Sequence, residues 1–181
     1  MVYMLIRLRT LKEITHIMER NNYLNIACYN ARGLMPSTRY ITKMLKENNI
    51  DVPDVSEHWL FPEMLAYINT FCDGYCGYGV SSQTLDPYTS HRRGKGGIAI
   101  IFKETLKDRI TIIDTNVDWI YGVGIQMEER NDVNVFGVYL PSSIYSNLTF
   151  CKCIEKLHNI YNQSSDQPCV ILVYFNALKK R

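Results

Sequence analysis

Residues 23–33 read YLNIACYNARG, and they indicate the fold of this chain more directly than any other segment. From Leu24 on, the apolar residues Ile26 and Cys28 recur at every second position, which is the pattern of a β-strand with one face on a core. The strand is predicted to end at Asn30, because the four residues NARG that begin there form a loop sequence. A polar amide therefore stands directly after a core strand.

On both sides of this strand the sequence alternates between helical and extended patterns. The predicted elements are a helix over Leu8–Arg20, the strand over Tyr23–Tyr29, a helix that Ser37 caps and that ends at Asn48-Asn49, a strand over Ile50–Ser56, a helix from Pro62 to Phe71, strands over Tyr75–Val80, Gly97–Phe102, Ile110–Asp114, Trp119–Met127 and Val133–Leu140, a helix over Asn147–Tyr161 with Phe150, Ile154, Leu157 and Tyr161 on its apolar stripe, and a strand over Val170–Phe175. This order predicts a mixed α/β layered domain. We expect residues 1–22 to form an N-terminal helical extension and residues 23–181 to form the domain.

The composition is that of an ordinary globular protein, with 46% hydrophobic and 21% charged residues among 181. The net charge is only +2, so any argument for nucleic-acid binding must come from local clusters. No apolar stretch approaches the ~20 residues that cross a bilayer, and Arg7 and Arg9 interrupt the apolar start. We therefore expect no membrane partner and an intracellular location, nuclear or cytoplasmic rather than secreted. The sequence leaves the oligomeric state open.

The six cysteines are expected to be reduced core residues. A four-thiolate zinc site is disfavoured, because no pair of cysteines has the C-x2-C spacing and no histidine stands at ligand spacing.

Polar groups follow several of the predicted strands, where they are placed to converge on one edge of the layered sheet. They are Asn30, the run Glu57-His58-Trp59, Tyr139 with Pro141-Ser142-Ser143, Asn176, and the basic loop from His91 to Gly97. A carboxylate, two amides and a phenol contain no nucleophile paired with a base, so they disfavour a serine or cysteine hydrolase. They suit Mg²⁺, which takes oxygen ligands, and they suit donation of hydrogen bonds to a phosphate.

Each of these residues also has an ordinary structural explanation. Taken singly, Glu57 is ordinarily a solvated carboxylate, Asn30 a turn former, Tyr139 a half-buried strand aromatic and Asn176 a cap. His58 and Trp59 are expected to pack and shape the loop. The basic residues Arg92, Arg93 and Lys95 are explained either by contact with a DNA backbone or by an exposed hairpin tip.

Five fragments, in their order along the chain, resemble a known superfamily. They are LNIACYNARG at residues 24–33, SEHWL at 56–60, GGIAI at 96–100, VYLP at 138–141 and VILVYFNA at 170–177. The chain from residue 23 to 177 resembles the endonuclease/exonuclease/phosphatase superfamily, most closely the endonuclease domain of non-LTR retrotransposons. The resemblance implies a four-layer α-β-β-α sandwich of two packed mixed sheets and Mg²⁺-dependent cleavage of phosphodiester bonds in DNA.

The resemblance also implies roles for individual residues. Glu57 corresponds to the principal metal carboxylate, and Asn30 to the amide beside the metal. Tyr139 corresponds to the phenol that contacts the scissile phosphate, and Asn176 to the amide that holds the attacking water and the phosphate. By the same resemblance Mg²⁺ is the expected cofactor and DNA the expected partner. Relatives that cleave phosphoinositides or sphingomyelin share the fold, but the fragments at 56–60 and 138–143 favour the retrotransposon branch.

The sequence departs from the family pattern in three places. Tyr174 stands where the family has the Asp that orients or deprotonates water, and a phenol with a reference pKa of ~10 cannot serve as that base near neutral pH. The family's C-terminal Ser-Asp-His motif has no counterpart, so the domain is expected to be C-terminally incomplete. Pro53 and Asp54 interrupt a strand that should be apolar, so an irregular strand is expected there.

These departures lead us to expect weak or absent turnover. The alternative functions that remain are a noncatalytic nucleic-acid or phosphate-binding remnant that uses the basic loop, and an expressed fragment without a biochemical role.

Overall fold

The computed structural model describes residues 3–9, 23–82, 94–127, 132–140, 147–163 and 167–175. Its elements, in chain order, are β1 (Tyr3–Arg9), β2 (Tyr23–Asn30), α1 (Leu34–Glu47), β3 (Val52–Ser56), the 3₁₀ helix η1 (Pro62–Asn69), β4 (Tyr75–Val80), β5 (Ile98–Lys103), the 3₁₀ helix η2 (Glu104–Arg109), β6 (Ile110–Ile113), β7 (Ile120–Ile125), β8 (Val133–Leu140), α2 (Asn147–Gln163) and β9 (Cys169–Phe175). No helix within these ranges is long and apolar enough to cross a membrane.

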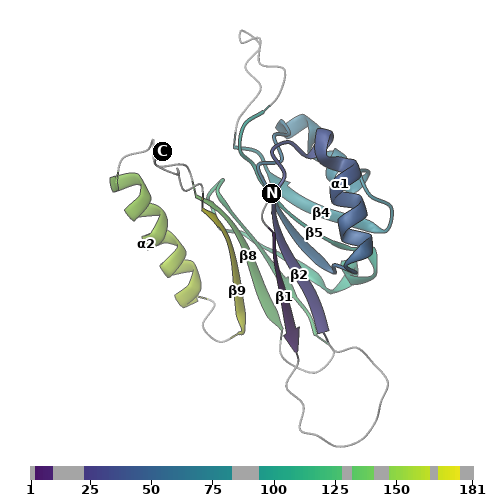
Figure 1. Cartoon of the computed structure of the whole chain (residues 1–181). Helices are drawn as coiled ribbons and strands as arrows, with labels where there is room; N and C mark the ends of the chain where they lie inside the picture. Colours follow the sequence, from purple (N-terminus) through teal and green to yellow (C-terminus); the bar gives the residue numbers. More distant parts are fainter. Residues whose placement is uncertain are drawn as a thin grey trace, which may run out of the picture.

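The strands form two mixed sheets that pack against each other. The first sheet has the order β1-β2-β3-β5-β4 and the second the order β6-β7-β8-β9. The β2–β3 and β8–β9 pairs are parallel, and the other pairs are antiparallel. Figure 1 shows α1 on the outer side of the first sheet and α2 on the outer side of the second. The predicted four-layer α-β-β-α sandwich is therefore confirmed.

Alternate residues of β2 face two different cores, as a period-two pattern requires. Ile26 and Cys28 pack between the sheets with residues such as Val135 of β8. Ala27 and Tyr29 belong to the core under α1 instead. β2 is therefore buried on both faces, and this burial specifies its pairing register.

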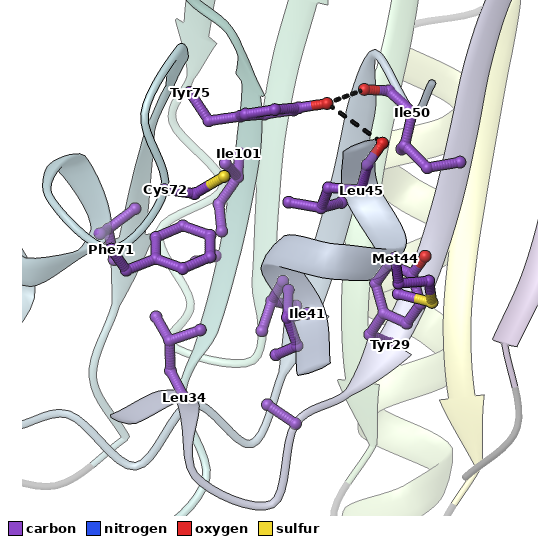
Figure 2. Packing of buried hydrophobic residues seen from close by; sticks show 14 of the residues in the cluster. Tyr29, Leu34, Ile41, Met44, Leu45, Ile50, Phe71, Cys72, Tyr75 and Ile101 are labelled. Carbon is purple, nitrogen blue, oxygen red and sulfur yellow. Dashed lines mark hydrogen bonds between the residues drawn. The ribbon is translucent and has the colours of Figure 1, made fainter. Parts of the chain in front are cut away.

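The core under α1 is closed at one end by Tyr75 (Figure 2). The buried Tyr75 hydroxyl donates to the carbonyl oxygen of Ile50 at 2.6 Å and lies 3.4 Å from that of Leu45. The phenol therefore satisfies carbonyls at the end of α1 and in the turn before β3, and it ties the helix to β4.

The prediction of a helix from Leu8 is wrong at its start. Leu8 and Arg9 lie in β1, whose residues pair antiparallel with β2 in the register Leu8 to Leu24. Ile6 and Leu8 alternate with Arg7 and Arg9, which is a strand pattern. Residues 3–9 follow this pattern and pair with β2, although Leu8 also begins a series of apolar residues at helical spacing. Residues 3–9 therefore belong to the first sheet. Residues 10–22 lie outside the described residues, so the rest of that helix and the boundary at residue 22 stay predictions.

Two details of the predicted helices are also wrong. The helix expected to be capped by Ser37 begins at Leu34, and the Ser37 hydroxyl donates instead to the Ala31 carbonyl oxygen at 2.8 Å. The buried face of α2 contains Cys153 and Ile160, and Leu157 of the predicted stripe packs against the same core, whereas Ile154 and Tyr161 of that stripe are 41% and 52% exposed. The buried face of α2 therefore agrees with the predicted stripe at Leu157 and differs from it at Ile154 and Tyr161.

Candidate active site at the ends of β2 and β3

Asn30 and Glu57 meet where two parallel strands end at the same edge of the first sheet. Asn30 is the last residue of β2, and Glu57 directly follows β3. The Asn30 side-chain amide donates from Nδ2 to Glu57 Oε1 at 2.8 Å, and Asn30 is only 4% exposed. The structure therefore brings together the two residues that the sequence predicted as metal ligands.

Glu57 stands in a strained loop that neighbouring loops hold in place. We call residues 57–60 the Glu57 loop and residues 94–97 the glycine loop. Glu57 and Trp59 have φ values of 54° and 58°, which residues with a Cβ rarely adopt. The amides of Glu57 and Trp59 donate to the carbonyl oxygens of Gly97 (2.8 Å) and Gly96 (3.0 Å).

A second set of backbone bonds holds the other side of the Glu57 loop. The amides of Gly33 and Leu34 donate to the carbonyl oxygens of Glu57 and His58, at 2.8 and 2.9 Å. The loop that leads into α1 and the glycine loop therefore clamp the Glu57 loop between them, and these bonds offset the cost of its left-handed residues.

His58 is the buried centre of this clamp, as its expected packing role implies. The side chain is 1% exposed, and Nδ1 accepts a hydrogen bond from the Leu60 amide at 2.9 Å. Nε2 therefore carries the proton and donates to the Val80 carbonyl oxygen at 3.0 Å. Burial lowers the pKa of His58 to about 4, so the ring is neutral at physiological pH.

Tyr139 reaches the same edge from the second sheet. It is the penultimate residue of β8 and is half-buried. A Cβ added at Gly96 would lie 3.4 Å from Cε1 of the tyrosine, so the ring lies beside the glycine loop. Three of the four predicted catalytic residues, Asn30, Glu57 and Tyr139, are thus gathered around the two loops. The fourth, Asn176, lies outside the described residues.

Of the predicted nucleic-acid contacts, the structure places Lys95. Its side chain is exposed, and its backbone is fixed because the neighbouring Gly94 amide donates to the Trp59 carbonyl oxygen at 3.1 Å. Lys95 therefore presents a positive charge at the rim of the candidate site. Arg92 and Arg93 lie outside the described residues, so their contact with DNA stays a prediction.

The donor set fits Mg²⁺ better than a transition metal. Among the residues that the structure describes, no group of three or more His, Cys, Asp or Glu could hold a metal ion. Glu57 and the Asn30 amide oxygen, which also accepts from the Arg32 amide at 3.1 Å, offer one carboxylate and one neutral oxygen. Mg²⁺ uses few protein oxygens and completes its shell with water and phosphate, so these residues fit it.

The prediction from sequence included Gly97 only as the end of the basic loop and the start of a strand, without a role of its own, and it missed Ser82. Gly97 has a φ of 82°, and its amide donates to the Ser82 hydroxyl oxygen at 2.8 Å. The consecutive glycines before β5 were a signal for such a backbone. The His58 ring also lies close to Gly97, and this contact depends on packing between distant segments, which the sequence does not show. Ser82 carries no comparable signal in the sequence.

Replacing Gly97 by alanine is expected to destabilise the fold by about 2 to 4 kcal/mol, from the left-handed φ and the overpacking together. The new Cβ would collide with the His58 ring. Urea unfolding measures the loss. Gly74→Ala is the matched control, since Gly74 has a φ of 81° but no atom within 4 Å of the new Cβ, and it should lose only about 1 kcal/mol. Equal losses in the two variants would contradict the role of the His58 contact.

Comparison with known proteins finds no matching family model and no matching curated protein. The similarity lies in solved structures instead. An AP endonuclease from Archaeoglobus fulgidus matches with a TM-score of 0.52 and 18% identity, over 79% of this chain and 51% of that one. The Neisseria 3′ phosphatase NExo, solved with a product DNA hairpin, matches with a TM-score of 0.56 and 16% identity, over 83% of this chain and 57% of that one.

An endonuclease/exonuclease/phosphatase family protein from Bacteroides thetaiotaomicron matches with a TM-score of 0.57 and 12% identity, over 84% of this chain and 61% of that one. At these identities the likeness establishes the fold, which is the fold of endonuclease/exonuclease/phosphatase proteins. The chain spans between half and two thirds of the length of these structures.

Proposed function

We propose that this chain is a Mg²⁺-dependent phosphodiesterase-like domain that acts on DNA, of the kind found in non-LTR retrotransposon endonucleases. The observation that carries the proposal is the Asn30–Glu57 hydrogen bond at the strand ends, beside the loop that Tyr139 contacts. AP endonucleases and a 3′ phosphatase bound to a DNA hairpin share the fold, which supports a nucleic-acid substrate.

In this proposal each residue at the site has a separate task. Glu57 and Asn30 would hold Mg²⁺, and the ion would supply stabilisation of the negative charge on the phosphate. The hydroxyl of Tyr139 donates to a phosphate oxygen, and Asn176 orients the attacking water and the phosphate. Lys95 attracts a neighbouring phosphate of the DNA backbone, because it is exposed at the rim of the site.

We further propose that turnover is weak, because the position of the general base holds a tyrosine. Tyr174 of β9 pairs in register with Tyr139 of β8, which is itself a candidate site residue. A phenol is protonated at neutral pH, so it cannot accept the proton that an ionised carboxylate accepts.

Nicking of supercoiled plasmid tests the catalytic proposal. We expect slow nicking that needs Mg²⁺ and that falls to the metal-free level in Glu57→Gln, which removes the charge and keeps the shape of the side chain. Glu63→Gln is the control, since Glu63 is an exposed carboxylate in η1. Nicking that survives in Glu57→Gln would contradict the assignment of the site, and rapid nicking by the wild type would contradict weak turnover.

The second candidate function is noncatalytic binding of DNA or phosphate. It is favoured by Lys95, whose backbone is fixed and whose charge is exposed. This function predicts metal-independent DNA binding that weakens with salt and with Lys95→Gln, Arg92→Gln and Arg93→Gln. Filter binding in EDTA measures it, and binding that the triple substitution leaves unchanged would exclude it.

A further inference from the structure

We infer that His58 is a positioning residue that holds the Glu57 carboxylate against Asn30. The inference rests on the proposed function only where it concerns Mg²⁺. Its structural part, that the ring maintains the Asn30–Glu57 hydrogen bond, can be tested without metal.

The His58 ring connects the Glu57 loop to two other segments. Nδ1 accepts from Leu60 within the loop, and Nε2 donates to Val80 at the end of β4. The Cε1, Nε2 and Nδ1 atoms of the ring lie so close to Gly97 that a Cβ there would collide with them. One buried side chain therefore fixes the loop to an edge strand and to the glycine loop at once.

Two neighbouring hydroxyls reinforce the same connection. The Ser81 hydroxyl donates to the Leu60 carbonyl oxygen at 2.8 Å, and the Ser82 hydroxyl accepts from the Gly97 amide at 2.8 Å. Residues 80–82 thus fasten both loops of the site, with His58 as the only buried ring among these contacts in the described part of the chain.

The direction of the Glu57 side chain depends on this connection. Its φ of 54° is unfavourable for a residue with a Cβ, so the backbone returns to a commoner conformation unless its surroundings prevent it. The hydrogen bond from the Glu57 backbone amide to the Gly97 carbonyl oxygen prevents this only while Gly97 stays in place, and the His58 ring packs on Gly97. Loss of the ring should therefore turn the Glu57 carboxylate away from Asn30.

Three substitutions separate the ring's contacts. His58→Asn retains an acceptor near the position of Nδ1, and His58→Gln retains a donor near the position of Nε2. His58→Leu retains apolar volume and neither hydrogen bond. We expect the Asn30–Glu57 bond to be weakened most in His58→Leu and partly restored in His58→Gln, since the Val80 contact spans the two segments.

The first readout is the Asn30 side-chain amide signal in NMR spectra of metal-free protein. The signal is assigned by its loss in Asn30→Asp, and Glu57→Ala gives its position when the hydrogen bond is broken. We expect the signal in His58→Leu to move toward that of Glu57→Ala. The second readout is Mg²⁺ affinity by calorimetry, which should fall roughly 10- to 100-fold, the usual effect of removing a residue that orients a metal ligand.

Tyr75→Phe controls for general loss of stability. The Tyr75 hydroxyl is also buried and bonded, but Tyr75 begins β4, whereas Val80 ends it. This variant should lower the melting temperature and leave the Asn30 signal and Mg²⁺ affinity unchanged.

The outcomes distinguish the positioning role from the proposed function. An Asn30 signal that stays at its wild-type position in folded His58→Leu overturns the inference, and so does an equal shift in Tyr75→Phe. If His58→Leu does not fold, an Asn30 signal that stays at its wild-type position in both folded His58→Asn and folded His58→Gln overturns the inference. A shifted Asn30 signal in a protein whose wild type binds no Mg²⁺ supports the positioning role and overturns the proposed metal site.

Discussion

Replacing Asp54 by asparagine is expected to change stability in a strongly pH-dependent way. Relative to the wild type, the free energy of unfolding of Asp54→Asn should rise by about 4 kcal/mol between pH 4 and pH 8. The absolute stability of the variant also includes a cost for the buried amide hydrogens, but that cost is the same at every pH and does not affect the rise.

The cause is a carboxyl group enclosed between the two sheets. Asp54 of β3 is fully buried, and the Cys28 thiol donates to its Oδ2 at 3.1 Å. Among the described residues Oδ1 has no hydrogen-bond partner, and it lies so close to Gly137 of β8 that a Cβ there would collide with it. Burial raises the pKa of Asp54 to about 7, although the hydrogen bond from Cys28 lowers it in part.

Stability changes with pH because the folded and unfolded states bind the Asp54 proton with different affinities. The folded protein keeps the Asp54 proton up to about pH 7, whereas the unfolded chain releases it near pH 4. The free energy of unfolding of the wild type therefore falls as the pH rises from about 4 to 7. Asp54→Asn does not show this fall, because asparagine does not ionise. His58 has the opposite effect, because its lowered pKa makes the fold less stable as the pH falls from about 6.5 to 4. Both proteins contain His58, so its contribution cancels in their difference.

Urea unfolding of both proteins at several pH values measures the difference. Glu47→Gln is the control, since the Glu47 side chain is 63% exposed and its removal tests the general effect of one negative charge. A stability difference between Asp54→Asn and the wild type that stays constant from pH 4 to pH 8 would show that Asp54 ionises normally in the folded protein.

The strands of the sandwich were predictable where alternation and turn residues agree. The structure gives β4 and β8 the predicted limits, Tyr75–Val80 and Val133–Leu140, and it places β2 where residues 23–29 alternate. The irregular strand expected around Pro53 is instead paired in continuous register with β2. A buried Asp54 with a raised pKa and a thiol donor is compatible with a regular strand. The sequence pattern does not show that Cys28 of β2 lies opposite Asp54 and supplies this donor.

The candidate site was predictable to the extent that it depends on strand ends. Asn30 ends a strand and Glu57 follows one, and parallel pairing of those strands brings the two residues together.

Two features were not predictable from the sequence. The η2 helix over residues 104–109 was not predicted, because its polar sequence has no apolar period. The contact of His58 with Gly97 was also not predictable, since it depends on how two loops pack.

Replacing Tyr174 by aspartate is expected to increase Mg²⁺-dependent plasmid nicking by about 10²-fold or more, the usual contribution of a general base. Tyr174 occupies the register position next to Tyr139, with Val173 next to Val138, so the new residue is introduced at the edge where the candidate site lies. An aspartate there is ionised at neutral pH and can accept a proton from the attacking water, whereas a phenol cannot.

Two further variants make this expectation specific. Tyr174→Asn has nearly the shape of aspartate without its charge, so it should leave the rate at the wild-type level if the base is what the chain lacks. The double variant Tyr174→Asp, Glu57→Gln should lose the gain, because in the proposed site the water that the new base deprotonates attacks a phosphate activated by the metal that Glu57 would hold. An equal gain in Tyr174→Asn would mean that the bulk of the tyrosine, rather than the missing carboxylate, limits the reaction.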